Sequence, residues 1–337
     1  MEEKDKKYWL ELYEIAIDIQ KLEPWKYLWD MDLLTLISPN IDDIVYCSVM
    51  GKGGLHKAIG IYFGNAINKF LDMAENDYPS HIAINYQECL MCQLASREHT
   101  LPKNRAIIKE LGLSFRGEWI SFENFEKGYE PSPLNIEQVK LMIEALKNFY
   151  MTFRAIIEKG AIADFEHGAT LLRTYDEKTK LWNTSLSPLM IPNPKYMRFE
   201  VRDKKFKSEV QKLPKKDFEI EYEFLNYMPM RIKGKKGERD FFPRARLIVD
   251  RTSGMVMSYD MPNKEDYESE MKYAENSAST IINMIFDIGR PKTIYVRDKE
   301  SENILMDICS EAGITLKANP KLKGIDKFYK EMERMGI

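Results

Sequence analysis

Phe241-Phe-Pro-Arg-Ala-Arg-Leu-Ile-Val-Asp-Arg-Thr-Ser-Gly-Met-Val-Met257 is the stretch that decides the fold of the C-terminal half. Its apolar runs at 247–249 and 255–257 flank five polar or small residues that can form a turn. The stretch therefore predicts a β-hairpin, followed further along the chain by Arg290-Pro-Lys-Thr-Ile-Tyr-Val-Arg-Asp298. A role in the turn of this hairpin explains Asp250 and Arg251 better than a role in catalysis.

The composition is that of an ordinary soluble protein with more than one unit. At 337 residues the chain exceeds the usual size of one domain, so two or three packed units are expected. A hydrophobic fraction of 44%, a charged fraction of 31% and a net charge of −3 indicate no particular partner. No apolar run reaches the roughly 18 residues of a membrane span, and the charged N-terminus does not resemble a signal peptide. We expect a cytoplasmic protein with no membrane partner.

The cysteines and the catalytic motifs predict neither a metal site nor a cofactor. Four cysteines are too few to staple this chain with disulfides, and a reducing cytosol keeps them as thiols. Cys89-Leu-Met-Cys92 has the spacing of a redox or zinc motif, but no second cysteine pair accompanies it. Hydrolase, metalloprotease and kinase signatures are absent from the sequence. A half-buried strand is the better explanation of the cysteine pair.

The first 132 residues predict an α/β domain with a mostly antiparallel sheet. Apolar residues between positions 8 and 19 recur at helical spacing. Three short runs rich in β-branched and aromatic residues follow, and they predict consecutive strands. The predicted elements are the helix at 8–19, strands at 33–37, 44–49 and 58–63, a helix at 64–74, at least one strand within 82–95, a short helix at 103–111 and a strand at 119–125.

A long helix is predicted to connect the two halves of the chain. Two prolines interrupt regular structure at 129–134, and Asn135 followed by Gln138 forms a capping-box pattern. The apolar arc of the helix that follows is wide enough to be covered on more than one side. We therefore assign 133–160 to a bridging helix, between an N-terminal domain at 1–132 and a C-terminal domain at 161–337.

The C-terminal domain is predicted to have a β-rich first part and a βαβ-like end, which makes the protein α+β. Strands are expected at 169–175, 218–224, 244–250 and 255–259. A strand at 293–296, a helix at 300–311 and a strand at 314–317 then alternate, and such alternation favours parallel pairing.

A groove between the two domains is the predicted ligand site, because ligands commonly bind at domain junctions. The loop Met50-Gly-Lys-Gly-Gly54 suits an anion only weakly, since it lacks the spacing of a phosphate-binding loop and a strand follows it. Hydrogen-bonding side chains at predicted strand ends or turns are the candidates to contact a small or anionic ligand. They are Lys52, His56, Tyr62, Arg251 and Arg297.

A basic segment at 195–250 is the basis of a second hypothesis, nucleic-acid binding. Its lysines can contact phosphates if they share a face, and Tyr222, Tyr227 and Phe241 can stack on bases. The candidate lysines are Lys204, Lys205, Lys207, Lys215, Lys216, Lys235 and Lys236. A solvated loop face explains the same charges, and Glu219, Glu221 and Glu223 alternate with apolar residues in a strand whose acidic face we expect to be exposed.

Two further classes stay open beside these binding hypotheses. A metal-dependent nuclease or phosphoryl hydrolase would use Asp250 or Asp298, because carboxylates at strand ends are common metal ligands. Strand ends also collect acids for turns. An assembly protein is the third class and predicts a large exposed apolar patch. The sequence predicts no oligomeric state.

Several short motifs at both ends of the chain resemble an uncharacterised two-domain bacterial family. Trp9, Pro24-Trp25, Tyr46-Cys-Ser-Val-Met-Gly51 and Gly60-Ile-Tyr-Phe-Gly64 resemble its first domain. Phe242-Pro243, Asp250-Arg-Thr-Ser-Gly254 and Arg290 to Asp298 resemble its second. The domains of this family have no assigned function, and some relatives carry a cysteine-rich SEC-C type metal-binding tail. The last cysteine here is Cys309, so the resemblance implies two intracellular domains and supplies no catalytic or metal-binding residue.

Overall fold

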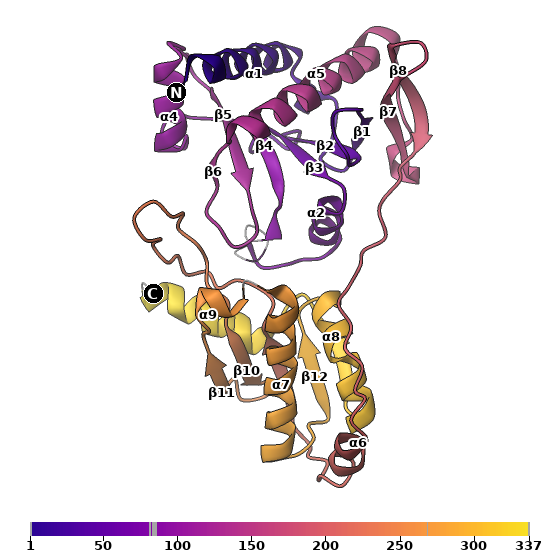
Figure 1. Ribbon diagram of the computed structural model, residues 1–337, viewed down its shortest axis with the longest axis vertical. Coiled ribbons are helices and arrows are strands. Elements are labelled where there is room, and N and C mark those ends of the chain that lie inside the picture. The colour runs from indigo at the N-terminus through magenta and orange to yellow at the C-terminus, as the bar shows by residue number, and fades with distance from the viewer. Residues whose placement is uncertain (1, 81, 83–85, 268, 336–337) are drawn as a thin grey trace. The chain divides into compact units, whose positions relative to one another are not determined.

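The computed structural model describes residues 2–80, 82, 86–267 and 269–335 (Figure 1). The chain divides into two compact units. Unit 1 contains Met1–Phe70, Gln87–Glu126 and Pro131–Asn193, and unit 2 contains Leu71–Tyr86, Lys127–Glu130 and Pro194–Ile337. Two segments from the first half of the sequence therefore belong to unit 2.

Unit 1 is built on a sheet of eight strands in the order β6-β5-β4-β3-β2-β1-β7-β8. All neighbouring strands in it are antiparallel except β1 and β7. The expected mostly antiparallel sheet is confirmed. The strands are β1 (Leu34–Ile37), β2 (Val45–Met50), β3 (Ala58–Phe63), β4 (Cys89–Ala95), β5 (Trp119–Phe125), β6 (Ser132–Pro133), β7 (Ala169–Asp176) and β8 (Leu181–Pro188).

Two long helices pack side by side on this sheet, as Figure 1 shows for α1 (Glu3–Leu22) and α5 (Ile136–Lys159). The capping box of α5 is formed as expected, since the Asn135 side chain accepts from the backbone N–H of Gln138 and the Gln138 side chain accepts in return. Shorter helices complete the unit. They are α2 (Ala66–Glu75), which continues into unit 2, α4 (Pro102–Glu110), and the 3-10 turns η1 (Pro24–Lys26) and η2 (Phe165–His167).

Helix α5 and the hairpin of β7 and β8 belong to unit 1. Strand β7 pairs in parallel with β1, from Thr35 opposite Leu172 to Ile37 opposite Thr174, and α5 packs against β1, β2 and β7. The limits predicted at residues 132 and 160 thus differ from the limits of the compact units. The compact units are defined by contacts and not by independent folding. The domain limits therefore stay a prediction.

Unit 2 has a five-stranded mixed sheet in the order β11-β10-β9-β12-β13. The hairpin of β10 and β11 is antiparallel, whereas β12 is parallel to both β9 and β13. Both the hairpin and the βαβ end are confirmed, and with them the α+β class. The elements are α6 (Lys204–Val210), β9 (Glu219–Glu223), β10 (Arg246–Asp250), β11 (Val256–Asp260), η3 (Lys264–Tyr267), α7 (Glu270–Ile288), β12 (Thr293–Val296), α8 (Lys299–Ala312), β13 (Thr315–Ala318) and α9 (Lys323–Met335).

The two faces of this sheet are covered by different helices. Ile220, Tyr222 and Phe224 pack with α7 and α8 in one apolar cluster. On the opposite face, Leu247 and Val249 pack with residues of α9 in another. Because side chains alternate along a strand, the acidic residues of β9 face α9. The expected exposed acidic face is therefore wrong: Glu221 and Glu223 are 0% exposed.

The turn between β10 and β11 is held by Asp250, as its sequence suggests. Its Oδ1 accepts from the backbone N–H groups of Thr252 at 3.1 Å and Ser253 at 2.7 Å, and Gly254 takes φ +73°. These bonds hold the pKa of Asp250 below its usual value. Among the described residues, no helix is long and apolar enough to span a membrane.

Replacing the cap of α5 gives a direct test of what this helix contributes to unit 1. We expect Asn135→Ala to lower the free energy of unfolding by about 1 kcal/mol, because a first-turn N–H loses its acceptor. Asn135→Asp keeps an acceptor and serves as the control. All five tryptophans lie in unit 1, so urea unfolding followed by tryptophan fluorescence reports on this unit. Equal stability of wild type and Asn135→Ala would contradict the prediction.

Candidate functional site

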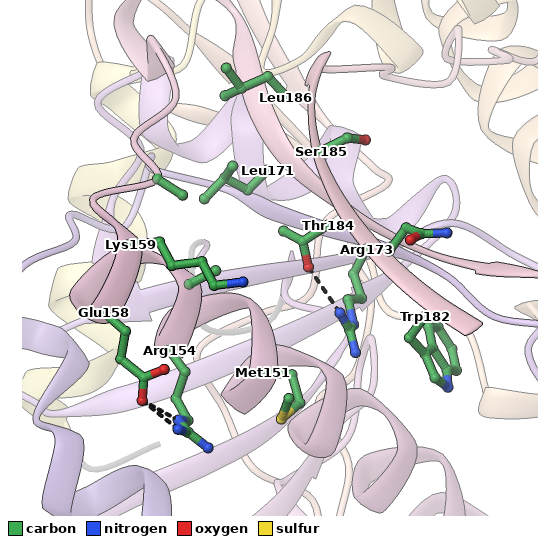
Figure 2. A pocket seen from close by; sticks show the side chains of 13 residues that line it. Met151, Arg154, Glu158, Lys159, Leu171, Arg173, Trp182, Thr184, Ser185 and Leu186 are labelled. Carbon is green, nitrogen blue, oxygen red and sulfur yellow. Dashed lines mark hydrogen bonds and ion pairs between the residues drawn. The ribbon is translucent and has the colours of Figure 1, made fainter.

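A pocket of about 520 Å³ in unit 1 lies between the C-terminal half of α5 and the β7–β8 hairpin. Figure 2 shows the helix residues Met151, Arg154 and Lys159 facing hairpin residues that include Arg173 and Trp182. The volume is within the range of pockets that hold small molecules. This pocket is the candidate site that we analyse from its residues upward.

Local sequence periodicity places the polar groups on the pocket side. Alternation along β7 puts Leu171 and Arg173 on one face of the hairpin. Arg173 is directly opposite Thr184 in the strand register, so Trp182 and Leu186 of β8 lie on that same face. The helix presents its side chains at spacings of three and four residues, which also share a face. Both walls of the pocket are thus set by secondary structure.

Arg173 is held in place by neutral groups. Its Nε donates to Asn148 Oδ1 at 3.3 Å and its Nη1 to Thr184 Oγ1 at 3.0 Å. The guanidinium carbon is 5.5 Å from the centre of the Trp182 ring. These contacts orient the guanidinium without neutralising it, since no carboxylate among the described residues forms an ion pair with Arg173.

A half-buried cation with no counterion is an unfavourable arrangement for the folded chain alone. Burial lowers the pKa of Arg173, although a guanidinium keeps its proton in proteins. Among the described residues, protein acceptors take two of its five N–H groups. A carboxylate or phosphate would supply both the missing charge and the missing acceptors, in the paired geometry that a guanidinium favours.

The remaining lining of the pocket adds positive charge and apolar surface. Arg154 donates to Glu158 at 2.6 Å, so these two charges balance. Lys159 forms no ion pair with the described residues and leaves a second positive charge at the rim. Leu171 is buried and Leu186 is 66% exposed. The arrangement suits an organic anion that also has an apolar part.

Of the predicted ligand residues, Lys52, His56 and Tyr62 lie in unit 1 and outside this pocket. Lys52 donates to the backbone carbonyl of Tyr27 at 2.7 Å and lies over the Trp29 ring. His56 is an exposed turn residue with φ +41°. Tyr62 is 1% exposed, and burial raises its pKa well above the usual value. Their role in ligand binding stays a prediction.

Arg251 and Arg297 belong to unit 2, and both are bound by carboxylates. Arg251 Nη1 is 2.7 Å from Glu221 Oε1, and its guanidinium lies 3.8 Å from the centre of the Tyr295 ring. The other oxygen of Glu221 accepts from the backbone N–H groups of Gly324 and Ile325, in the first turn of α9. This carboxylate therefore links β9, the hairpin turn and α9, consistent with the favourable position of an anion at a helix N-terminus.

Arg297 is the centre of a buried polar cluster in unit 2. It donates to Glu223, to Asp326 Oδ1 at 2.7 Å and to the carbonyl of Pro320 at 2.6 Å. Burial tends to lower the pKa of Arg297, but the charges of Glu223 and Asp326 outweigh it and raise the pKa. Burial also raises the pKa of Glu223, and Arg297 opposes that rise. Since the guanidinium keeps its proton, we describe the pair as ionised.

The carboxylates of the enzyme hypothesis have structural roles in unit 2. Asp250 holds the hairpin turn, as described above. Asp298 is 3% exposed and caps α8, with Oδ1 accepting from the backbone N–H of Ser301 at 2.8 Å. Its Oδ2 accepts from Tyr86 at 2.9 Å and from Asn226 at 3.2 Å. Within the described residues no group of three or more His, Cys, Asp or Glu is arranged to hold a metal ion.

The candidate nucleic-acid lysines fall into three places in unit 2. Lys204, Lys205 and Lys207 are on α6, where Lys207 pairs with Glu311 at 2.6 Å and Lys205 approaches Glu209 at 4.0 Å. Lys215 and Lys216 form backbone contacts with Arg290.

Lys235 and Lys236 are exposed in a loop. Tyr222 is 0% exposed, so its predicted role in stacking is wrong. Tyr227 and Phe241 line a separate pocket of unit 2.

The sequence analysis missed Arg173 and Trp182 because it did not predict β8. A signal was present in Asp176-Glu-Lys-Thr-Lys180, which separates two strand-like runs. In the structure Asp176 Oδ1 accepts from the backbone N–H groups of Lys178 and Thr179 and thereby forms the turn. The alternation of Trp182, Thr184 and Leu186 was the second part of that signal.

Removing the charge at the centre of the unit 2 cluster distinguishes a structural role from ligand binding. We expect Arg297→Met to lower the free energy of unfolding by about 3–5 kcal/mol, because Glu223 is left buried without its partner. Arg202→Met removes the exposed pair with Glu200 and should cost at most about 1 kcal/mol. Far-ultraviolet circular dichroism during urea unfolding measures both. A loss below about 1 kcal/mol for Arg297→Met would refute the structural role.

Comparison with known proteins gives families without an assigned function. The model of a domain of unknown function, DUF7309, matches residues 9–173, and the model of a second domain of unknown function, DUF6930, matches residues 207–333. No curated protein matches the chain. The resemblance seen in the short motifs of both halves is confirmed. Together the two matches give a two-domain family without an assigned function.

Proposed function

We propose that this chain is a binding protein, with a regulatory or carrier role, that takes up an organic anion in the pocket between α5 and the β7–β8 hairpin. The observation that carries the proposal is Arg173, a half-buried guanidinium that is oriented by neutral partners and has no counterion among the described residues. Leaving such a charge unpaired costs stability. A bound carboxylate or phosphate removes that cost.

The other pocket residues indicate what the rest of the ligand is. Lys159 adds a second cation at the rim, and Trp182 offers a ring face beside the guanidinium. Leu171 and Leu186 provide apolar contacts on the hairpin side. We therefore expect a small carboxylic acid or phosphate ester with an aliphatic or aromatic body.

The pocket at Arg173 is a different position from the groove that the sequence predicts between the two domains. A shared groove for Lys52, His56, Tyr62, Arg251 and Arg297 stays a prediction, with the first three residues in unit 1 and the last two in unit 2. We further propose a cytoplasmic location. Four cysteines that remain as buried thiols support it, because exported proteins commonly oxidise theirs.

A panel of small anions tests the proposal by thermal shift at constant ionic strength. We expect a carboxylate or phosphate ester with an apolar body to raise the melting temperature of the wild type by several degrees at about 100 times its Kd. Arg173→Gln should abolish the shift. Arg116→Gln removes an exposed arginine of unit 1 that forms no ion pair among the described residues, and it should keep the shift.

The tryptophan beside Arg173 gives a second readout of the same event. Ligand should change the intrinsic fluorescence of the wild type, and Trp182→Phe should remove that change while the thermal shift remains. If no anion in the panel stabilises the wild type, or if Arg173→Gln responds as the wild type does, the pocket does not bind anions and the proposal fails.

A further inference from the structure

A second pocket, of about 310 Å³, is formed within unit 2 by aromatic rings and basic side chains. Its walls include Tyr129, Tyr227, Phe241 and Phe242, with Lys127 and Lys264 at its edge. Tyr129 comes from Lys127–Glu130, one of the two short segments from the first half of the chain that belong to unit 2.

Backbone pairing fixes the walls of this pocket. The N–H of Phe242 donates to the carbonyl of Gly128 at 2.8 Å. The N–H of Glu130 donates to the carbonyl of Asp240 at 3.2 Å. Ile232 and Phe241 exchange backbone hydrogen bonds at 2.8 and 3.0 Å. Residues 127–130 therefore add a third chain to the loop hairpin 232–241.

The floor of the pocket depends on a glycine. Gly128 has φ +80°, and a Cβ built there would lie 2.4 Å from Cε1 of the Tyr227 ring. Only a residue without a side chain lets the backbone lie against this ring. The ring of Tyr227 is therefore covered by backbone on one side and is held in a fixed orientation.

Cations surround the rings of the pocket. Lys264 Nζ lies 4.9 Å from the centre of the Tyr129 ring and 5.0 Å from that of Phe241. Arg239 lies 4.8 Å from the centre of the Tyr129 ring. Among the described lining residues Glu270 is the only carboxylate, and both terminal nitrogens of Arg244 bind it at 2.8 Å. Basic side chains therefore lie against the ring faces of this pocket.

The loop hairpin that forms the pocket also presents a row of lysines. Lys233, Lys235 and Lys236 are exposed, and none forms an ion pair with a described residue. Lys233 directly follows Ile232, the pairing partner of Phe241. A ring-lined pocket is thus adjacent in the chain to unpaired cations, which is the combination that binds single-stranded nucleic acid by stacking and by phosphate contacts.

We propose that this pocket receives one base of a single-stranded nucleic acid, while Lys233, Lys235 and Lys236 contact the neighbouring phosphates. A base in a duplex is stacked and paired and cannot enter the pocket without leaving the helix. A free mononucleotide has the base but lacks the chain of phosphates that the lysines would contact. The three ligand classes are therefore separable by experiment.

Fluorescence anisotropy with a labelled 15-residue oligothymidylate, between about 20 and 200 mM NaCl, tests the proposal on the full-length protein. We expect wild-type affinity to fall with salt, by a log–log slope of about 0.7 for each phosphate contact. The double variant Lys235→Ala/Lys236→Ala should lower that slope by about 1.4. Both residues are exposed, so this variant should keep the wild-type melting temperature.

Phe241→Leu tests the stacking part. It keeps an apolar side chain but loses the ring, and we expect binding about fivefold to 150-fold weaker with an unchanged salt slope. Lys103→Ala/Lys109→Ala, on exposed positions of α4 in unit 1, is the matched control and should bind as the wild type does.

Four results would each overturn the proposal. They are no anisotropy change at 20 mM NaCl, a duplex of equal length bound as tightly as the single strand, a mononucleotide bound as tightly as the oligonucleotide, and equal weakening by the α4 control. None of them bears on the anion pocket at Arg173, which lies in unit 1 and is tested by other variants.

Discussion

The contact between Arg297 and Glu223 is the interaction on which the order of unit 2 depends. It joins the end of β12 to β9, and through Asp326 it also fixes α9 over the sheet. Glu221, two residues before Glu223 in β9, also connects the sheet to α9, because it accepts from backbone N–H groups in the first turn of that helix. Charges buried in this way require all their partners. The position of α9 is therefore specified by electrostatics as well as by the apolar contacts of Leu247 and Val249.

Arg173 shows what the same residue type does when its partners are neutral. Arg297 is surrounded by two carboxylates and a carbonyl, whereas Arg173 has an amide oxygen and a hydroxyl. The first arrangement neutralises the guanidinium with carboxylates of the same chain. Within the described part of the chain, the second leaves the charge without a counterion and three N–H groups without acceptors. This difference in partners is the physical reason to place ligand binding at Arg173.

Both proposed sites combine positive charge with ring faces but differ in what they can hold. The pocket beside Arg173 is larger, at about 520 Å³, and has one oriented guanidinium, so it suits a whole small anion. The pocket beside Phe241 is smaller, at about 310 Å³, and continues into a row of exposed lysines, so it suits one unit of a polyanion. The two proposals together assign a small molecule to unit 1 and a nucleic acid to unit 2.

The sequence by itself determined the local elements, because periodicity, turn residues and caps act over a few neighbouring positions. The hairpin around Asp250, the capping box at Asn135 and the βαβ end were all predictable on this basis. Only the tertiary structure decided what covers each face. Alternation along β9 predicts an acidic face and an apolar face. It does not predict that α9 covers the acidic face, as it does in the structure. Likewise, the partners of Arg173 and Arg297 come from distant segments, so whether an arginine is paired or available follows from packing and not from its neighbours in sequence.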